Sequence, residues 1–283
     1  MSTWTHRQRL DRCEDRRTDP AWIASLWPSA RVLAVTADGR LAASPDTLDW
    51  AEAEGDYDDQ RHHLLGLLGD RAAFAVQADT APHVLREVMD GLPEADVEVA
   101  FTAVALVGWH ARSGFCPVCG AATTAVAGGL LRRCTRCGTE HHPRNDPAVI
   151  VAIVDADDRL LLGRQPVWPP RRYSVFAGFA EAGESLEQAV HREMAEEIGL
   201  EVSDISYLGS QPWPFPQSLM VGFTSRAASG EVRLLDGEIE HARWFTRAEL
   251  GAAIASQEVL LPMKTSIANR MINSWLDGDL RPS

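Results

Sequence analysis

The first hundred residues alternate short apolar runs with turn signals. Segment 31–42, RVLAVTADGRLA, places two apolar runs around an Asp-Gly turn, and segment 62–77, HHLLGLLGDRAAFAVQ, repeats this around a Gly-Asp turn. Apolar runs of strand length on both sides of such dipeptides predict β-hairpins. A short helical pattern, PHVLREVMDGL, follows, and the apolar spacing of 95–113 predicts a longer helix. We expect a small N-terminal α+β domain over 1–112, which packs or dimerises, with His110 a packed or surface residue.

The pattern changes after EHHPRNDP. Segment 148–165, AVIVAIVDADDRLLLGRQ, predicts a buried strand, a turn and a second strand. The runs SLMVGFTSRA and EIEHARWFT predict later strands, and 264–276 predicts a C-terminal helix. Within GFAEAGESLEQAVHREMAEEIGL, a helix is expected over 185–198, because Ser185 and Gln188 form a capping box and Gly199 suits a helix end. Strands before and after this helix predict an α/β/α sandwich over 143–283.

The predicted helix carries carboxylates on its apolar face. Leu186 and Val190 begin a stripe that continues with Glu193 and Glu197, and Glu196 lies within the same arc of roughly 100°. Unpaired carboxylates on an inward face would repel one another and lose hydration, which costs several kcal/mol. Either this face is solvated, or it binds a hard divalent cation such as Mg²⁺ or Mn²⁺. The helix alone leaves both interpretations open.

Four cysteines form two C-x2-C pairs that are separated by 14 residues, each pair followed by glycine. They are Cys116, Cys119, Cys134 and Cys137. This spacing is typical of a zinc ribbon, in which four thiolates close a tetrahedral Zn²⁺ site at roughly 2.3 Å and leave no open position. A redox pair and an iron–sulfur site are the alternatives. We expect one structural zinc ion in a ribbon over 113–142, whereas Cys13 is expected to be a plain thiol.

The overall charge limits the classes of partner. The 283 residues carry a formal net charge of −13, which argues against sequence-independent binding of nucleic acid. An anionic substrate would need local cations or metal. No apolar run approaches the roughly 18 residues that a membrane helix needs, and the polar, arginine-rich start has no apolar core of a secretory signal. We therefore expect a cytoplasmic protein without a membrane partner.

The residues around the glutamates resemble the Nudix box. The matching positions are Gly178, Glu184, Arg192, Glu193, Met194, Glu196, Glu197, Gly199 and Leu200. The segment SQPWPFPQSLM at 210–220 and the upstream four-cysteine ribbon resemble, within that family, the NADH pyrophosphatases of the NudC type. The resemblance implies a Nudix fold preceded by a zinc ribbon and the small N-terminal α+β domain.

The resemblance also implies roles for individual residues. Two or three Mg²⁺ or Mn²⁺ ions would bind the Ala177 carbonyl, Glu193, Glu197 and Glu238, with Glu196 nearby. Glu240 is close enough to Glu238 to remain an alternative. Gly178, Glu184 and Arg192 would shape the loop and helix. Substrate contacts are implied for Phe179, Gln211, Pro212, Trp213, Pro214, Phe215, Pro216, Gln217, Ser218, the Ala268 backbone and His142.

The proline-rich array Gln211–Ser218 also has a physical interpretation. Its three prolines would fix an extended loop at low entropic cost, with Trp213 and Phe215 as stacking surfaces. Gln211 and Ser218 would supply hydrogen-bonding groups. The alternative is a proline-rich connector with packed aromatic rings.

The resemblance implies hydrolysis of the pyrophosphate of NAD(H) to nicotinamide mononucleotide and AMP. It also implies removal of NAD caps from RNA 5′ ends, leaving 5′-monophosphate RNA, by a homodimer. Two alternatives remain: a Nudix hydrolase of ADP-ribose or a diadenosine polyphosphate, and a catalytically silent protein that binds a ligand or RNA. The sequence leaves open which glutamate is the base.

Overall fold

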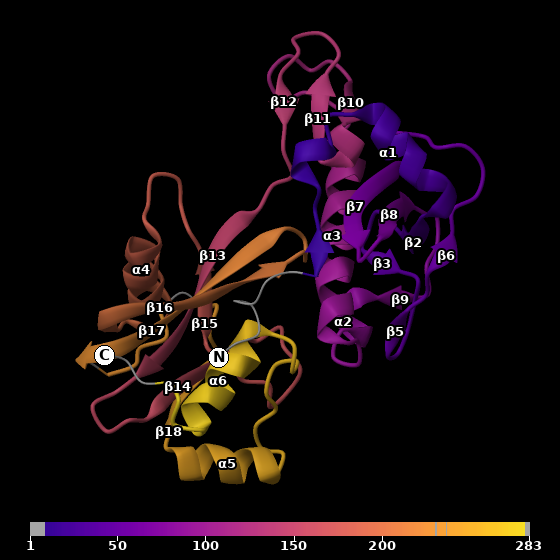
Figure 1. Cartoon of the computed structure of the whole chain (residues 1–283). Helices are drawn as coiled ribbons and strands as arrows, with labels where there is room; N and C mark the ends of the chain where they lie inside the picture. Colours follow the sequence, from indigo (N-terminus) through magenta and orange to yellow (C-terminus); the bar gives the residue numbers. More distant parts are fainter. Residues whose placement is uncertain (1–8, 230, 236, 281–283) are drawn as a thin grey trace. The chain divides into compact units, whose positions relative to one another are not determined.

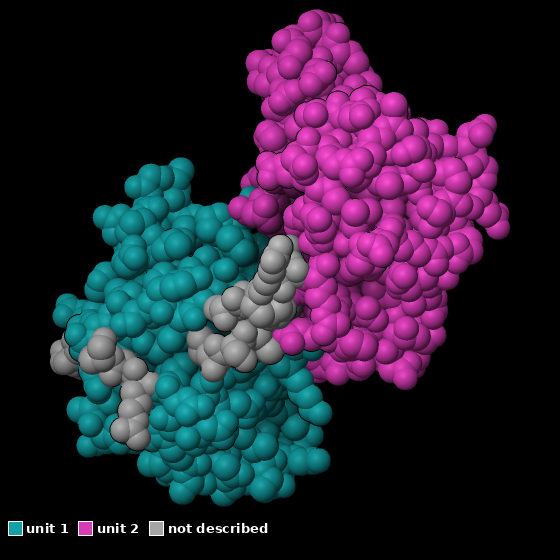
Figure 2. Space-filling model, in the orientation of Figure 1, with its two compact units in different colours: residues 1–6, 146–212, 218–283 teal, residues 7–145, 213–217 magenta. Residues whose placement is uncertain are grey.

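The chain forms two compact units (Figures 1 and 2). The computed structural model describes residues 9–229, 231–235 and 237–280. The N-terminal unit comprises 7–145 together with Trp213–Gln217, and the C-terminal unit comprises the described parts of 146–212 and 218–283. A short segment of the later sequence thus belongs to the N-terminal unit. Within the described residues, no helix has the length and apolar character needed to cross a membrane.

The N-terminal unit is built on a mixed seven-stranded sheet, against which helix α3 packs. The strand order is β1-β7-β8-β2-β3-β9, with β6 paired to β2. The strands of this sheet are β1 (Leu10–Asp11), β2 (Arg31–Val35), β3 (Arg40–Leu41), β6 (Ala51–Glu52), β7 (His62–Leu68), β8 (Arg71–Gln77) and β9 (His83–Val84). The strands β4 (Ala43–Ser44) and β5 (Thr47–Leu48) form a separate pair. The helices are α1 (Pro20–Leu26), α2 (Leu85–Val88) and α3 (Glu94–Arg112), with 3-10 turns η1 (Glu14–Arg16) and η2 (Trp27–Ser29). Both predicted hairpins, β2–β3 and β7–β8, are confirmed, and so is the long helix.

The cysteine-rich segment forms a three-stranded antiparallel sheet within the same unit. Its strands are β10 (Thr123–Val126), β11 (Leu131–Cys134) and β12 (Glu140–His141), and the 3-10 turn η3 (Ala127–Gly129) joins the first two. Turn η3 contacts strand β7 of the larger sheet, and it also contacts helix α1. The ribbon is therefore anchored to the rest of the N-terminal unit through η3.

A pair of buried histidines strengthens this anchor. The rings of His63 on β7 and His110 on α3 stack with centroids 3.8 Å apart and an interplanar angle of 6°. Nε2 of His110 lies 2.7 Å from the Gly129 carbonyl oxygen, and its Nδ1 lies 2.9 Å from the Arg132 guanidinium. Of the two expected placements of His110, packed or at the surface, the structure shows the packed one. Burial, together with the smaller effect of the nearby Arg132 charge, lowers the pKa of His63 to about 3 and that of His110 to about 4. Both rings are therefore neutral at pH 7.

The C-terminal unit is a mixed six-stranded sheet with helices on both faces. The strand order is β16-β17-β13-β14-β18, and β15 pairs with β13. The strands are β13 (Asp146–Val154), β14 (Leu160–Arg164), β15 (Phe176–Phe179), β16 (Glu201–Trp213), β17 (Ser218–Ser229) and β18 (His241–Phe245). The helices are α4 (Leu186–Ile198), α5 (Arg247–Ala255) and α6 (Ile267–Leu276). Strand β13 pairs in parallel with β17 and antiparallel with β15.

Strand β13 is the centre of this unit because both of its faces are buried. Val149, Val151 and Ile153 join a core cluster with residues of α4. The alternate residues, including Ile150 and Ala152, join a second cluster with residues of α5 and α6. The continuous apolar run AVIVAIV is therefore that of a strand covered on both faces. The predicted α/β/α sandwich is confirmed.

Helices α1 and α5 and strand β16 are among the elements that were not predicted from the sequence. Helix α1 begins after Asp19, whose side chain accepts hydrogen bonds from the first turn, and has Pro20 at its first position. Helix α5 begins with a capping box of Thr246 and Glu249. Both signals are visible in the sequence. The edge strand β16 leaves much of its length exposed, so its apolar alternation is faint.

The expectation of an extended loop over Gln211–Ser218 is wrong. Strand β16 continues through Trp213 and β17 begins at Ser218, so 214–217 is a turn between two long strands. Pro212 is part of β16, where the missing N–H is tolerated because β16 lies at the edge of the sheet. The prolines therefore mark a strand end and a turn.

We expect the free energy of unfolding to decrease as the pH falls below about 6.5. A histidine with a lowered pKa in the folded chain is protonated first in the unfolded chain. Its stabilising contribution is complete above the unfolded pKa and is lost as the pH falls towards the folded value. Each buried histidine should lower the free energy of unfolding by about 1.4 kcal/mol per pH unit in this window. Urea unfolding at a series of pH values measures the slope.

The control for this experiment is His63→Gln, which removes one titrating group and keeps all four ribbon cysteines. The variant should show a shallower dependence on pH than the wild-type chain. Because zinc loss at low pH would affect both proteins alike, equal slopes would contradict a role for His63.

Candidate functional site

Helix α4 is defined at both ends by its sequence. The Ser185 hydroxyl accepts a hydrogen bond from the Gln188 N–H at 3.1 Å, and the Gln188 side chain accepts one from the Ser185 N–H at 2.8 Å. Gly199 ends the helix with φ of +65°, a conformation that favours glycine. The prediction of this helix is confirmed, and its limits fix the rotation at which the glutamates project.

Arg192 connects the helix to the loop that precedes it. Its Nε and Nη2 donate to the two Glu184 carboxylate oxygens, both at 2.9 Å, and Nη2 also donates to the Phe179 carbonyl at 2.8 Å. Its Nη1 donates to Glu193 at 2.9 Å and to Glu196 at 3.1 Å. These hydrogen bonds lower the pKa of Glu184, which stays ionised. One guanidinium thus sets the positions of the loop and of two helix carboxylates.

The three helix glutamates differ in exposure. Val190 and Glu197 are buried, at 0% and 2% exposed, so the predicted inward stripe is confirmed. The Glu193 side chain is 13% exposed, whereas that of Glu196 is 58% exposed. Glu196 therefore lies at the solvent side of the group, and Glu193 and Glu197 lie at its inner side.

Gly178 lets β15 and α4 approach closely. A Cβ atom at this position would lie 1.9 Å from Cδ of Glu193, a distance no side chain could occupy without displacing the carboxylate. The glycine is required here by the close approach, since it is not among the residues with positive φ. It follows that the Glu193 carboxylate lies directly against the backbone of β15.

The pKa of Glu193 indicates which carboxylate outside helix α4 lies near the helix glutamates. Burial raises the pKa of Glu193, the Arg192 charge opposes this, and the negative charges of Glu196 and Glu238 raise it further. Glu240 instead forms an ion pair with Arg164. Glu238 therefore lies within electrostatic range of Glu193, and Glu240 is paired with Arg164.

The carboxylate oxygens of these glutamates and the raised pKa of Glu193 fit the binding of a divalent cation. A cavity of about 80 Å³ is lined by Ala177 of β15 and Glu197 of α4, with Gln165 and Trp168 on its wall. A cation would remove the repulsion that raises the pKa of Glu193. Among the described residues, the four cysteines are the only group of three or more His, Cys, Asp or Glu side chains placed to hold a metal ion, and their ligand atoms lie within 4.8 Å of one another. The glutamates do not form such a group, so an ion bound there would take part of its coordination shell from water or substrate oxygens.

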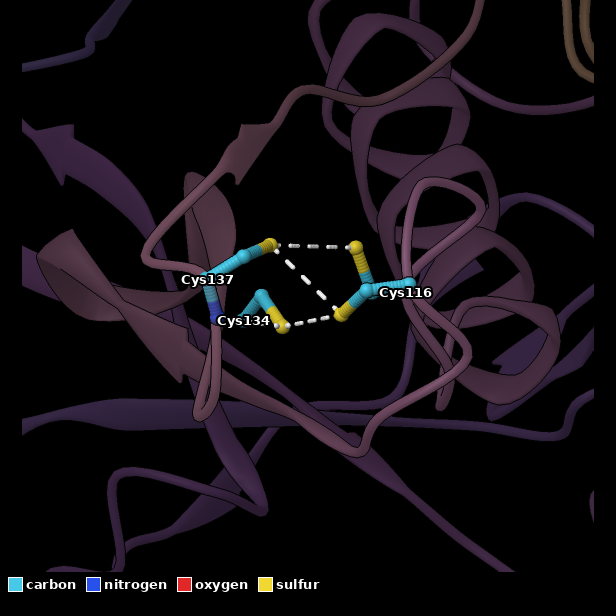
Figure 3. A group of neighbouring side chains, drawn as sticks. Cys116, Cys134 and Cys137 are labelled. Carbon is cyan, nitrogen blue, oxygen red and sulfur yellow. Dashed lines mark hydrogen bonds between the residues drawn. The ribbon is translucent and has the colours of Figure 1, made fainter.

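The four ribbon cysteines are arranged as zinc ligands (Figure 3). The Sγ–Sγ distances are 3.7 Å for Cys116–Cys137, 3.4 Å for Cys119–Cys134 and 3.6 Å for Cys119–Cys137. A tetrahedron with Zn–S bonds of about 2.3 Å has edges of about 3.8 Å. All five cysteines of the chain are free thiols. The predicted structural zinc site therefore fits the geometry.

The two glycines behind the cysteine pairs have the conformation that such knuckles need. Gly120 and Gly138 both have φ of +72°. Backbone N–H groups of Arg136 and Cys137 donate to the Cys134 sulfur, each at 3.4 Å. Hydrogen bonds from the backbone stabilise the thiolate that zinc requires.

The start of the proline-rich array supports helix α6. Gln211 is fully buried; its side-chain amide donates to the Thr265 carbonyl at 2.8 Å and accepts from the Ile267 N–H at 2.7 Å. Ala268, the next residue of α6, is 6% exposed. Ser218, at the start of β17, is also buried. The Gln211 amide is therefore committed to the beginning of α6, and the structure brings Gln211 and Ala268 close together.

The aromatic part of the array belongs to the N-terminal unit. The rings of Trp213 and Phe215 are 5.2 Å apart at 78°. The Arg86 guanidinium of α2 lies 4.5 Å from the Phe215 ring centroid, and Phe101 of α3 meets both rings edge to face. Arg86 and Phe101 were missed because no motif or spacing connects either residue to the array 110 or more positions later.

The other expected contact residues differ in exposure. Phe179, at the end of β15, is 56% exposed. His142 is exposed directly after β12, in the N-terminal unit. Gln217 accepts a hydrogen bond from Arg112 at 3.5 Å. Pro212 and Pro216 are exposed, whereas Pro214 is buried.

Comparisons with known proteins agree with this arrangement. The model of the NUDIX domain matches residues 144–263, and that of the NADH pyrophosphatase zinc ribbon domain matches residues 111–141. The chain is 41% identical to the NAD-capped RNA hydrolase NudC of Mycobacterium bovis, over 94% of this chain and 92% of that protein. It is 39% identical to the Homo sapiens NAD-capped RNA hydrolase NUDT12, over 65% of this chain and 43% of that protein. A NUDIX hydrolase structure from Nitrosomonas europaea aligns with 25% identity and a TM-score of 0.40, over 48% of this chain and 78% of that one.

Gly178→Ala should weaken binding of divalent cations at the glutamate group. The added methyl group would displace the Glu193 carboxylate, and we expect affinity for Mn²⁺ to fall at least about tenfold, or about 1.4 kcal/mol. Titration followed by electron paramagnetic resonance measures free Mn²⁺.

The matched control is Gly251→Ala in helix α5, where a Cβ atom meets nothing within 4 Å. Its Mn²⁺ affinity should equal that of the wild-type chain. Wild-type affinity in Gly178→Ala would show that Glu193 does not contribute to the cation site.

Proposed function

The chain belongs to the Nudix hydrolases, among the zinc-ribbon NAD-capped RNA hydrolases, and on that premise we propose that it hydrolyses the pyrophosphate of NAD(H). The products are nicotinamide mononucleotide and AMP. With an NAD cap on RNA, the same cleavage leaves a 5′-monophosphate end. The observation that carries the proposal is the group of carboxylates that Arg192 orients on α4, in a chain that also holds the ribbon and the proline-rich array.

The glutamates and the β15 backbone would hold the cations. We propose the Ala177 carbonyl, Glu193, Glu197 and Glu238 as the ligands of two or three Mg²⁺ or Mn²⁺ ions. When bound, these ions neutralise the diphosphate and lower the pKa of a water molecule. Such cations also explain how a protein of net charge −13 binds an anionic dinucleotide.

The residues of the chain supply orientation and proton transfer. Arg192 fixes Glu193 and Glu196 by hydrogen bonds, so the carboxylates need little rearrangement when the substrate arrives. Glu196 is the most exposed of the three helix glutamates and can exchange protons with solvent. The inward position of Glu193 and Glu197 suits cation binding, because the repulsion between carboxylates is relieved by positive charge. The assignment of the base among them is left to pH–rate profiles of single variants.

Aromatic rings are proposed to recognise the dinucleotide. The exposed Phe179 ring offers a stacking face for the nicotinamide, and the Trp213–Phe215 pair offers a second aromatic surface. The other array residues, Ala268 and His142 complete the proposed contacts. Because the Gln211 amide is bonded to α6, we assign it to the support of the Ala268 backbone.

Three further properties are proposed with this function. The chain is organised as an N-terminal domain over 1–112, a ribbon over 113–142 and a Nudix domain over 143–283. It forms a homodimer, as the resemblance to the subfamily implies. It acts in the cytoplasm, as the sequence predicts.

Glu197→Gln should abolish most of the activity. Loss of one inward carboxylate charge removes a cation ligand, and we expect kcat for NADH to fall at least about 100-fold in both Mg²⁺ and Mn²⁺. Glu187→Gln, an exposed position in the first turn of the same helix, should retain wild-type kcat. Thermal unfolding shows that both variants are folded. Undiminished turnover in Glu197→Gln would refute the catalytic role and favour a silent binding protein.

The substrate class is tested by a panel with product identification. NADH, NAD-capped RNA, ADP-ribose and a diadenosine polyphosphate are compared at matched concentrations, with Glu197→Gln as the background. We expect kcat/KM for NADH or NAD-capped RNA to exceed that for ADP-ribose at least about tenfold, because the array provides a surface for a second ring. If ADP-ribose were cleaved and both NAD substrates were inert, the proposed specificity would be lost.

A further inference from the structure

Phe101 is the one residue of helix α3 that meets both rings of the array Trp213–Phe215 in edge-to-face geometry, among the contacts of the described residues. Its ring lies 6.5 Å from that of Trp213 at 77°, and 6.4 Å from that of Phe215 at 89°. Trp213 and Phe215 are themselves 5.2 Å apart at 78°. Each ring therefore presents an edge to a neighbour's face, an arrangement preferred over parallel stacking.

Phe101 lies on a helix that packs against the N-terminal sheet. Helix α3 packs against strands β2, β7 and β8 of the N-terminal sheet, and it leads directly into the ribbon. Phe101 itself is 3% exposed, so it offers no surface to a ligand. A side chain held in this way can fix the position of its neighbours but cannot contact the substrate.

The array needs such support because its backbone fixes only part of its geometry. Pro212, Pro214 and Pro216 restrict the backbone of the turn, but they leave the side-chain torsions of Trp213 and Phe215 unrestricted. Those torsions depend on what the rings contact. The contacts of the turn place it in the N-terminal unit, although the strands on either side belong to the C-terminal unit.

We propose that Phe101 is a positioning residue, which holds Trp213 and Phe215 in the orientation that receives a ring of the dinucleotide. This inference rests on the function proposed for the array. Phe101 is the residue of the N-terminal unit that would orient the array's rings. The rings lose fewer torsional states on binding when they are oriented in advance. Phe101 should therefore affect substrate affinity and leave the chemistry on α4 unchanged.

The test replaces Phe101 by leucine, which keeps an apolar side chain and removes the aromatic edge. We expect KM for NADH to rise about five- to twentyfold in Phe101→Leu, with kcat within about twofold of wild type. The matched control is Val104→Ala, a core change on the same helix beside the turn at Gly39. It should lower the thermal midpoint comparably and leave KM unchanged. If Phe101→Leu does not fold, Phe101→Met provides the same comparison.

A second measurement reports on ring position without substrate. The chain is labelled with 5-fluorotryptophan, and the ¹⁹F resonance of Trp213 is assigned by its absence in Trp213→Phe. Loss of the neighbouring aromatic edge should shift or broaden this resonance in Phe101→Leu, and Val104→Ala should leave it in place. An aromatic replacement, Phe101→Tyr, should restore KM towards the wild-type value.

The outcomes separate this inference from the proposed function. If the wild-type chain cleaved no NAD substrate, the proposed function would fail, and the ¹⁹F spectra would still show whether Phe101 orients Trp213. If the wild-type chain were active and Phe101→Leu had wild-type KM and an unshifted resonance, the positioning role would be overturned. An equal rise of KM in Val104→Ala would also overturn it, because the effect would then follow general destabilisation.

Discussion

The site depends on one guanidinium group. Without Arg192, Glu184, Glu193 and Glu196 would be three negative charges close together, and burial already raises the pKa of Glu193. Arg192 satisfies them through a planar set of donors and uses a further hydrogen bond to hold the Phe179 carbonyl. A lysine could not reproduce this geometry, because its ammonium group has no planar fork. The position of the loop, the rotation of the helix side chains and the exposure of Phe179 all follow from these bonds.

The N-terminal unit instead buries two titratable side chains in their neutral form. His63 and His110 stay neutral in its interior, where their rings stack and connect a strand, a helix and the ribbon. Gly129 makes this possible, because a Cβ atom there would lie 2.6 Å from Nδ1 of His63. The ribbon is thus anchored by two neutral, stacked histidine rings, with the Arg132 guanidinium beside them. The carboxylates Glu184, Glu193 and Glu196 of the C-terminal unit are instead held by ion pairs with Arg192.

Local signals explain what the sequence could predict. Helix α4 follows from Ser185, Gln188 and Gly199, the zinc site follows from the cysteine spacing, and β13 follows from a run that is apolar on both faces. What was missed depends on contacts between distant segments. Strand β16 lies at a sheet edge, and the partners of Trp213 lie on helices more than a hundred residues earlier. The ion pair between Arg164 and Glu240 likewise joins separate segments, and no periodicity predicts it.

Because Trp213–Gln217 belongs to the N-terminal unit, recombination between genes cannot exchange either unit as one continuous stretch of sequence. Residues 146–280 contain the glutamates, the helix that carries them and the sheet behind them. A recombination event that moved this stretch alone into another gene would transfer the hydrolytic machinery. The turn between β16 and β17 would arrive without the helices it packs on in its parent. Exchange between genes at the boundary of the two units would therefore separate the glutamates of α4 from the contacts of the turn that we propose to receive the substrate.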